Sequence, residues 1–429
     1  MSFGFFTARD FKINNPAALG EGCGKCRLYK GRVSPRIKPF GEMRKGIMLL
    51  GEGPGYNEDQ QGIPFVGDSG KFLTDHLSKL GIDMDQDCVR LNAVQCRPTK
   101  VEDGKIKNRT PTEVEVEHCR GRVWQAIEQY KPKLIISLGA SSVDSLLGHR
   151  WNEVGDDGKV TGLGSIYRWH SWQIPDRDTK CWICPTYHPA FVLRELNERG
   201  ENNALEGIFA GDLKRAVAIL GQPVPTWENE RDSVEIITDD DHGVHRIEQI
   251  ARGAAFIVID YETTGLKPQN NGHHIVYIGI AVDENTAIVF PTRGMKRTMR
   301  AYRELVQETT ILKGAHNMQF EDMWTRERLG VQVEGWRICT MQTAHVLDQR
   351  KGVSGLKFQS YVQTGLVDYS SHVAKYLTAT DADVEAYGDN AFNRIYDAPP
   401  KEVMIYCGTD CLSTYRIAMI QAKQLGIQL

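Results

Sequence analysis

Short apolar runs separated by polar, glycine-rich stretches recur along the first half of the chain. Residues 47–50 (IMLL) and 133–138 (KLIISL) have the composition of buried β-strands, and residues 182–184 form a third such run. Strands of this kind, each followed by polar segments, predict an α/β unit.

Apolar residues at helical spacing lie between these strands. A helix is predicted from Asp68, because apolar side chains then recur on one side as far as Leu80. A second helix is predicted with Thr110 as its N-cap, Pro111 at its first position and Glu113 closing a capping box.

The second half repeats the alternation with different spacing. Strand-like runs occupy residues 256–260, 275–282 and 287–290, and helices are expected from residue 356 onward. Residues 221–235 carry two prolines followed by charged residues, which is typical of a linker. We therefore predict a first domain over 1–222, a linker over 223–235 and a second domain over 236–429.

Length and composition fit a multidomain globular protein. The chain has 429 residues, 41% of them hydrophobic and 25% charged, and no apolar run approaches the length of a membrane span. The N-terminus lacks a basic-then-apolar signal pattern, so we expect a cytoplasmic protein (host cytoplasm if viral) with no membrane partner. A net charge of −3 does not exclude DNA binding, which depends on local patches.

Ten cysteines in such a chain suggest metal ligation by some of them. Cys23 and Cys26 form a CxxC motif, and Cys96 and Cys119 follow singly. Zinc and an iron–sulfur cluster both accept four thiolates, so spacing alone leaves the two open.

A second CxxC, Cys181 and Cys184, has a different interpretation. Positions i and i+3 of a strand face opposite sides, so these two cysteines are predicted to lie in the core rather than to share a metal.

A glycine-rich loop, residues 51–55 (GEGPG), follows the first strand. This is the usual place for a ligand site in an α/β unit, and glycines let the backbone approach a ligand closely. The loop lacks the Lys-Ser/Thr pair of a P-loop, which argues against nucleotide hydrolysis. His188 lies after the third strand, just before a proline, where a catalytic histidine would be well placed.

Four motifs together resemble the family-4 uracil-DNA glycosylases. They are GEGPG, EDQQGIPFVG, NAVQCRP and YHPA, the last with Arg194 four residues beyond its alanine. The resemblance covers roughly residues 18–222 and implies a three-layer α/β fold. It also implies a 4Fe–4S cluster held by Cys23, Cys26, Cys96 and Cys119. The chain departs from the family at Gly53, where alanine is usual, and at residues 101–108, which lengthen a loop.

The resemblance implies a pocket for a uracil that has left the base stack. Phe65 would stack on the base, although a core position for this ring is the alternative. Asn92 would pair with the uracil edge, because its amide is both donor and acceptor. His188 would stabilise negative charge on the departing uracil.

The glycine-rich loop is implied to face the sugar. Glu52 and Glu58 are both candidates to assist the attacking water, and the sequence does not choose between them. Gly53 and Arg194 are expected to contact DNA. Residues 191–193 would either wedge into the duplex or pack in the core.

Two carboxylates follow an apolar, strand-like run within residues 257–266 (IVIDYETTGL). Asp260 and Glu262 are two residues apart, so on a strand both side chains face the same side. Adjacent carboxylates repel unless a cation lies between them, which favours a divalent metal held by oxygen ligands. The alternative is a strand that simply runs into an acidic turn at Gly265.

Two further motifs follow in order. Residues 315–322 (AHNMQFED) contain NxxF followed by acids, and Tyr406 and Asp410 lie four apart in a predicted helix. DxE, NxxF with an acid and YxxxD resemble the proofreading 3′–5′ exonuclease domain of family A DNA polymerases, of the DEDD tyrosine type. The resemblance implies an RNase H-like fold with a mixed sheet.

That family holds two divalent cations, Mg or Mn. Here the implied ligands are Asp260, Glu262, Asp410 and one acid of the second motif, with Tyr406 orienting the attacking water.

The acid of the second motif is open between two neighbours. Register favours Glu321, and chemistry alone would also accept Asp322. Asn317 and Thr263 are expected to contact the substrate.

The combined resemblance implies a DNA-processing enzyme that excises uracil and degrades DNA 3′–5′. The arrangement resembles the front half of certain phage family A polymerases, so a separate polymerase chain or a missing C-terminal polymerase domain is expected as partner. Two alternatives remain at this point: the first domain only binds uracil-containing DNA, or the nuclease acts on RNA.

Overall fold

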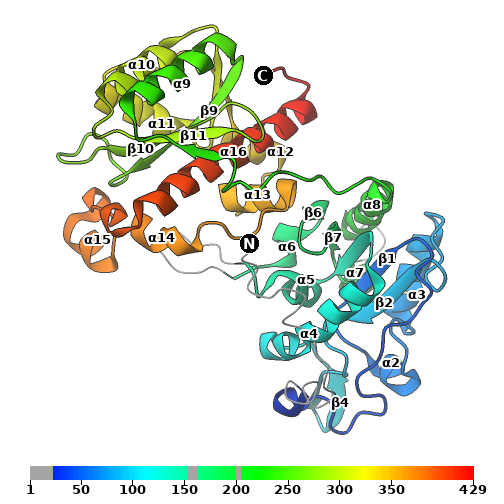
Figure 1. Cartoon of the computed structure of the whole chain (residues 1–429). Helices are drawn as coiled ribbons and strands as arrows, with labels where there is room; N and C mark the ends of the chain where they lie inside the picture. The colour runs from blue at the N-terminus through cyan, green and yellow to red at the C-terminus, as the bar shows by residue number, and fades with distance from the viewer. Residues whose placement is uncertain (1–22, 152–161, 200–203) are drawn as a thin grey trace. The chain divides into compact units, whose positions relative to one another are not determined.

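A computed structural model describes residues 23–151, 162–199 and 204–429 (Figure 1). Its contacts divide the chain into two units, one holding the described residues up to Val224 and the other those from Pro225 to Leu429. Within the described ranges, no helix is both long enough and apolar enough to cross a bilayer.

The first unit is built on a five-stranded sheet in the order β2-β1-β5-β7-β6, whose first four strands are parallel and whose edge strand β6 is antiparallel. Every residue of these strands is buried, as expected for a parallel sheet covered on both faces. Its strands are β1 (Ile47–Gly51), β2 (Cys88–Asn92), β5 (Leu134–Leu138), β6 (Ile174–Asp176) and β7 (Cys181–Thr186).

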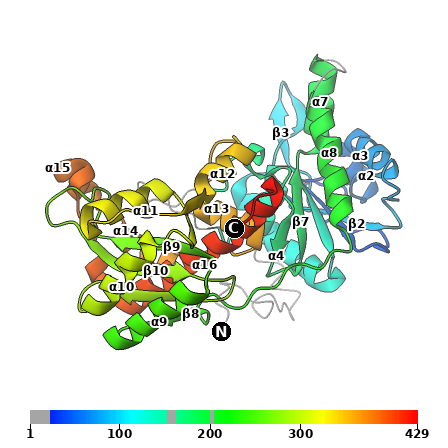
Figure 2. The ribbon, with the colours of Figure 1, turned by 90° about the horizontal axis from the view of Figure 1, so that it is seen from above.

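Helices cover both faces of this sheet. Ile47 and Leu49 of β1 pack in one core with side chains of α3 and α8, while α5 contacts β1 and β5, and α4 packs on α5. The helices α7 and α8 lie against each other beside β7 (Figure 2). The predicted three-layer α/β fold is thus confirmed. The helices are α2 (Tyr56–Gln61), α3 (Asp68–Ser78), α4 (Glu113–Tyr130), α5 (Ala140–Leu147), α6 (Ile166–Trp169), α7 (Pro189–Arg199) and α8 (Ala204–Ile219).

The predicted cap of α4 is wrong by two residues. Thr112, not Thr110, is the N-cap: its hydroxyl accepts from the Glu115 amide at 3.3 Å, and the Glu115 carboxylate accepts from the Thr112 amide at 2.9 Å. The sequence offers a threonine three residues before a glutamate at both places. Arg109 decides between them, because its guanidinium holds both oxygens of Glu115.

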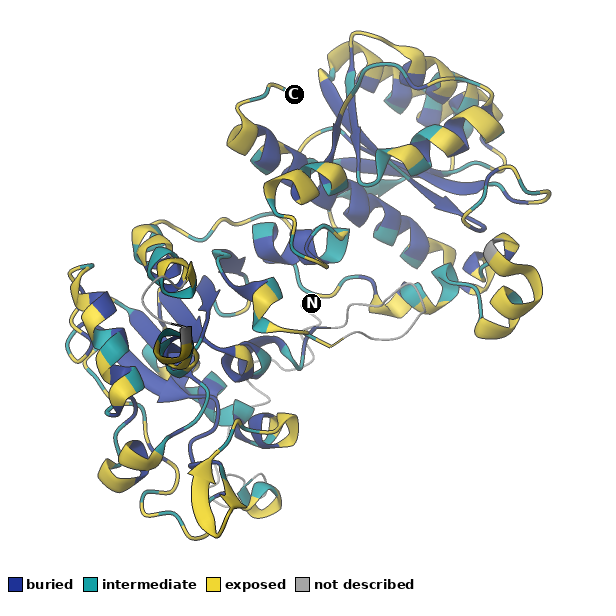
Figure 3. Ribbon diagram, turned by 180° about the vertical axis from the view of Figure 1, so that it is seen from behind, coloured by how far each residue is buried: buried dark blue, intermediate teal, exposed yellow. Residues whose placement is uncertain are grey.

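The second unit has a mixed sheet in the order β13-β12-β9-β10-β11-β8. The pairs β9–β10 and β10–β11 are antiparallel, and β8, β12 and β13 join in parallel, which confirms the predicted mixed sheet. The sheets of both units are largely buried (Figure 3). The strands are β8 (Val234–Ile236), β9 (Phe256–Thr263), β10 (Ile275–Ala281), β11 (Ala287–Pro291), β12 (Leu312–Ala315) and β13 (Trp336–Cys339).

The long helix α16 (Pro400–Leu425) packs along one face of this sheet, with Val403, Cys407, Cys411 and Leu412 in two apolar clusters. The other face is covered by α9, α10 and α11. Besides α16 the helices are α9 (Asp240–Gly253), α10 (Lys296–Gln307), α11 (Met318–Trp324), α12 (Thr340–Leu347), α13 (Leu356–Thr364), α14 (Ser371–Leu377) and α15 (Asp381–Tyr387). Short π and 3₁₀ turns occupy Thr325–Leu329, Gly388–Asn390 and Ile395–Asp397.

The end of the predicted linker belongs to the second unit. Strand β8 begins at Val234, and Glu230 is buried in an ion pair with Arg416 of α16. The charged residues that suggested a solvated linker therefore include one that anchors the segment to the second unit.

Candidate active sites

The glycine-rich loop that follows β1 is held in shape by a buried carboxylate. Glu58 accepts from the Gly55 amide at 3.0 Å, the Val66 amide at 3.0 Å and the Gly67 amide at 2.8 Å. The last residue of the loop and the later residues Val66 and Gly67 are thus tied to one side chain, which is only 7% exposed. Glu58 is therefore occupied as a brace, and its oxygens are committed to backbone amides.

Phe65 has a backbone conformation that this brace maintains. Its φ is +57°, in the left-handed region that costs a non-glycine residue about 1–2 kcal/mol. Gly70 makes the turn possible, since a Cβ there would lie 1.9 Å from the Phe65 carbonyl oxygen. The ring of Phe65 lies 6.4 Å from that of His188 at an interplanar angle of 24°.

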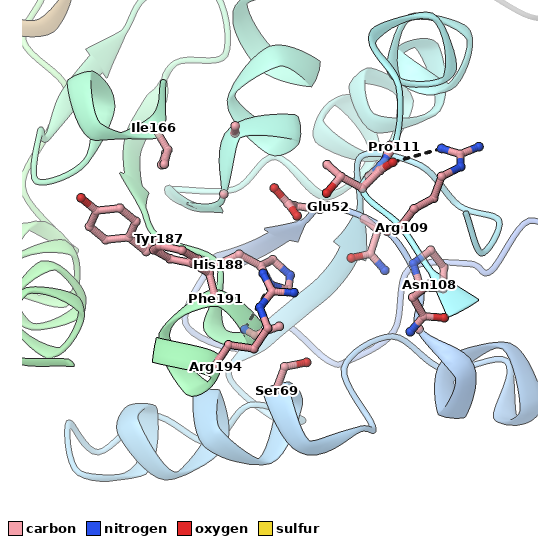
Figure 4. Close-up of a pocket in the computed structure, with 18 of the residues that line it drawn as sticks. Glu52, Ser69, Asn108, Arg109, Pro111, Ile166, Tyr187, His188, Phe191 and Arg194 are labelled. Carbon is pink, nitrogen blue, oxygen red and sulfur yellow. Dashed lines mark hydrogen bonds between the residues drawn. The ribbon is translucent and has the colours of Figure 1, made fainter. Parts of the chain in front are cut away.

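A cavity of about 1230 Å³ opens beside this loop (Figure 4). Of the residues predicted to act on uracil, all seven line it: Glu52, Gly53, Glu58, Phe65, Asn92, His188 and Arg194. They come from loops or helices at the carboxyl ends of β1, β2 and β7, where an α/β sheet usually places its ligand site. Phe191 also lines the cavity, whereas Val192 is fully buried.

His188 is held in a defined protonation state. Burial lowers the pKa of its imidazole, so the ring is neutral at neutral pH. The Ala190 amide donates to Nδ1 at 3.2 Å, which leaves the proton on Nε2. The side chain thus offers one hydrogen-bond donor without a full charge.

Of the two predicted glutamates, Glu52 lines the cavity and its carboxylate does not brace the loop as that of Glu58 does. Gly139, the N-cap of α5, has φ +93° and leaves room for it, since a Cβ there would lie 2.6 Å from Glu52 Oε1. A helix N-terminus favours a negative charge beside it.

Gly53 packs against the segment that carries Cys96. A Cβ at Gly53 would lie 2.8 Å from Val94 Cγ2 and 3.2 Å from Pro98. The departure from alanine at this position therefore has a steric basis in this chain. It also couples the loop directly to the cysteine segment.

Four cysteine side chains gather near that segment. Cys96 and Cys119 are buried, Cys23 and Cys26 are half-buried, and none forms a disulfide. Burial, with smaller contributions from the charges of the other three thiols, raises the pKa of Cys119 to about 12. The Arg36 amide donates to Cys96 Sγ at 3.3 Å. Sulfur donors from three segments and nearby amide donors fit a metal or a metal cluster.

The second site lies between β9 and α16. Carboxylate oxygens of Asp260, Glu262 and Asp410 all lie within 4.8 Å of one another. Burial, followed by the charge of Asp410, raises the pKa of Asp260 to about 7, and burial with the charge of Asp260 raises that of Glu262 well above its ordinary value. Such a set needs a cation to be fully ionised, so it fits divalent metal binding.

The structure separates the two acids of the second motif. Glu321 is 2% exposed, and its Oε2 is buried without a hydrogen-bond partner. Burial and the charge of Asp260 raise its pKa. Asp322 instead pairs with Arg326 at 2.8 Å and accepts from the Trp336 indole at 3.1 Å. Only Glu321 is thus electrostatically coupled to the carboxylates of β9 with an oxygen to spare.

Tyr406 and two unpredicted residues complete this site. The Lys357 ammonium lies 2.6 Å from Asp410 Oδ1 and 3.0 Å from the Tyr406 hydroxyl. The Tyr369 hydroxyl donates to Asp410 Oδ1 at 2.5 Å. Neither Lys357 nor Tyr369 belongs to a spaced acidic motif, and only the packing of α13 on α16 brings Lys357 there.

The two expected substrate contacts of the second unit have different environments. The Thr263 hydroxyl donates to the Gly265 carbonyl at 2.7 Å and is buried. Asn317 is half-buried at the start of α11 with φ +67°, a conformation that asparagine tolerates better than most residues.

Comparison with known proteins gives each unit a relative. Residues 38–210 match the family model of the uracil DNA glycosylase superfamily, and residues 234–425 match that of a 3′–5′ exonuclease family. A type-4 uracil-DNA glycosylase of Pyrobaculum aerophilum is 38% identical over 207 residues, covering 46% of this chain and 93% of the relative. That of Saccharolobus solfataricus is 36% identical over 208 residues, covering 48% and 86%.

A third relative spans both units. A DNA polymerase of Bacillus phage SP01 is 23% identical over 413 residues, which cover 89% of this chain and 40% of the polymerase. Among solved structures, Brucella melitensis NrnC with bound Mg²⁺ is 15% identical with a TM-score of 0.33, covering 45% of this chain and 82% of NrnC.

The raised carboxyl pKa values predict how the second unit responds to pH without metal. Asp260 titrates near pH 7 when folded and near 4 when unfolded, so the folded form binds its proton more tightly. This stability is fully present below about pH 4 and is lost as pH rises through about 7. In EDTA, the melting temperature of the second unit should therefore fall between about pH 5 and about pH 8.

Two variants test this assignment by differential scanning fluorimetry. Asp260→Asn should reduce the pH dependence, to which Glu262 and Glu321 also contribute. Asp322→Asn, which removes a carboxylate paired to Arg326, should leave it unchanged. A profile identical in the wild type and Asp260→Asn would contradict the assignment.

Proposed function

Since this chain belongs, in its first unit, to the type-4 uracil-DNA glycosylase family and carries a 3′–5′ exonuclease domain in its second, we propose how its residues perform both reactions. The protein excises uracil from DNA and degrades DNA from the 3′ end. Both reactions are hydrolyses, one of a glycosidic bond and one of a phosphodiester bond. The observation that carries the first is the cavity that gathers the seven predicted residues; the second rests on the buried carboxylate set.

Uracil release depends on stabilising the base as it departs. Uracil enters the cavity, stacks on Phe65 and pairs with the Asn92 amide. As the bond to the sugar breaks, its electrons move onto the uracil ring. The proton on His188 Nε2 is donated as a hydrogen bond to the oxygen where charge develops.

Water then adds to the sugar carbon. Of the two predicted glutamates, Glu52 is the one available to orient that water and to stabilise the positive sugar, because the oxygens of Glu58 accept from three amides. We therefore assign the reaction to Glu52 and the shape of the loop to Glu58. Arg194, exposed at the rim, binds a DNA phosphate.

We assign the four cysteines of the first unit to a 4Fe–4S cluster. The assignment is supported by four free sulfur donors from three segments and by the membership of the type-4 family. The cluster would act structurally here: it fixes the Val94–Pro98 segment against which Gly53 packs.

In the exonuclease, Asp260, Glu262, Glu321 and Asp410 would hold two divalent cations, Mg²⁺ or Mn²⁺. Such cations would supply Lewis acidity for the attacking water and for the leaving oxygen. The Tyr406 hydroxyl orients the attacking water, and Lys357, at 3.0 Å from it, fixes its position. We assign Asn317 and Thr263 to contacts with the substrate strand. The Thr263 hydroxyl already donates to the Gly265 carbonyl, so Thr263 would contact the strand through its other atoms.

We propose a family A polymerase as the partner, either as a separate chain or as a C-terminal domain joined to this chain. The support is the phage polymerase that aligns with 89% of this chain across both units. His188 disfavours a role in binding alone. The Ala190 amide fixes the tautomer of its ring, with the proton on Nε2, and mere binding of uracil does not require this arrangement.

The cluster assignment predicts a coloured protein. Protein purified without oxygen should be brown, with the broad visible absorption of an iron–sulfur centre and about four iron atoms per chain. Cys96→Ser should lose the colour and lower the stability of the first unit alone. Stoichiometric zinc without iron would contradict the assignment.

The role of His188 predicts a large rate loss. His188→Ala should reduce uracil release from single-stranded DNA by about a hundredfold or more, the cost of removing one transition-state donor. Uracil release is measured in EDTA, where the exonuclease is silent. Exonuclease activity of the same variant, assayed in Mg²⁺, should be unchanged, and retention of the visible absorption of the iron–sulfur centre serves as the folding control for the first unit. Equal uracil release in wild type and variant would remove His188 from the reaction.

The separation of Glu321 from Asp322 predicts unequal effects of two conservative changes. Mutation of a residue that only hydrogen-bonds to a metal ligand typically costs roughly 10- to 100-fold in activity. Glu321→Gln should lower exonuclease activity by more than this, because it changes a ligand itself. Asp322→Asn should cost less than tenfold, since it disturbs a pair to Arg326. The opposite order would place Asp322 in the metal site.

A further inference from the structure

A small exposed hairpin stands beside the mouth of the uracil cavity. It consists of β3 (Thr99–Glu102) and β4 (Lys105–Asn108), which pair only with each other. It is the segment that lengthens the loop between Cys96 and Cys119. In Figure 3 it is drawn almost wholly as exposed, and Figure 1 places its β4 at the edge of the first unit.

The base of the hairpin is firmly fastened. Arg109 donates to the Thr99 carbonyl at 3.1 Å and holds Glu115 of α4 with both guanidinium nitrogens. Arg32, just beyond the CxxC segment, donates to the Thr99 hydroxyl at 2.7 Å. Arg97 donates to Asn108 Oδ1 at 2.7 Å. An isolated two-stranded hairpin is marginal in water, so these bonds give it a fixed direction.

Two β-branched apolar side chains are exposed on this fixed support. Val101 and Ile106 are directly opposite each other in the strand register and are 76% and 62% exposed. They contribute nothing to either core. Exposing two adjacent apolar side chains to water costs free energy. Because they do not stabilise the fold, their exposure suggests a role in binding.

The apolar pair shares one side of the hairpin with a residue of the cavity. By strand alternation, Val101 and Ile106 lie on the same side as Asn108, which lines the cavity. Lys100, which also lines the cavity, lies with Lys107 on the opposite side. Residues 99–109 carry four basic and two acidic side chains, a net charge of +2. Both acids lie at the turn, where Glu102 pairs with Lys100 at 3.2 Å and with Lys107 at 2.8 Å. The apolar pair stands just before this turn, on a hairpin whose base borders the uracil site.

We propose that the hairpin is a strand-separating wedge, whose Val101 and Ile106 pack against the bases left unstacked when uracil leaves a DNA duplex. Apolar side chains inserted between bases offset part of the cost of unstacking, and the lysines beside them hold the flanking phosphates. The proposal rests on uracil excision by the first unit and extends it to duplex substrates. In single-stranded DNA there is less stacking to replace, so the hairpin matters less there.

The test compares uracil release from duplex and from single-stranded oligonucleotides of the same sequence, with the full chain in EDTA. The double variant Val101→Ser/Ile106→Ser should lower the ratio of duplex to single-strand rates by about tenfold. Val101→Leu/Ile106→Leu retains the apolar surface and should retain the ratio. Val346→Ser, at an equally exposed valine (71%) in the second unit, is the matched control.

A fluorescent 2-aminopurine next to the uracil gives a second readout that does not depend on turnover. With a non-hydrolysable uracil nucleotide, its fluorescence should rise on binding the wild type and rise less with the serine variant. An unchanged ratio in the serine variant, or an equal loss on both substrates, would overturn the wedge. Absence of uracil release by the wild type on single-stranded DNA would instead overturn the proposed function itself.

Discussion

In both units the chain gathers side chains of a kind that is anionic in metal sites: buried carboxylates in the second unit, and four cysteines, two buried and two half-buried, in the first. Such sets are unfavourable without positive charge, because burial and mutual repulsion both oppose ionisation. The second unit shows this most directly: Asp260, Glu262 and Asp410 share one buried volume, and Lys357 contributes the one ammonium that contacts a carboxylate of this set in the described structure. Apolar packing of α16 on the sheet places the elements around them, and the ionisation of the carboxylates then changes the stability of this arrangement.

The first unit uses a comparable separation of tasks. One carboxylate, Glu58, is spent on shaping a loop, so that another, Glu52, is left free to face the cavity. The loop also rests on the Val94–Pro98 segment, which carries one of the four cysteines. If the cysteines hold a metal cluster, its loss should first change the conformation of the glycine-rich loop and of the hairpin that follows Pro98, and only later that of the buried sheet.

Sequence predicted most of the architecture because periodicity and ordered motifs are local. The strands at 47–50 and 256–260, the mixed sheet and the gathering of the uracil residues all follow from such signals. What sequence missed depends on contacts between distant segments. The cap of α4 moved because Arg109 selects Glu115, and Lys357 entered the second site through packing of α13 on α16. The choices between Glu52 and Glu58, and between Glu321 and Asp322, required knowing which oxygens were already engaged.

Helix α16 has a practical consequence for anyone who wishes to separate the two activities. It carries Tyr406 and Asp410, fills one face of the second sheet with Cys407 and Leu412, and holds Glu230 through Arg416. Proposed site residues, core and anchorage thus lie in one continuous stretch of 26 residues. A truncation within α16 would therefore disrupt the core of the second unit together with its site, whereas Asp410→Asn changes one side-chain atom and keeps the apolar packing of the helix.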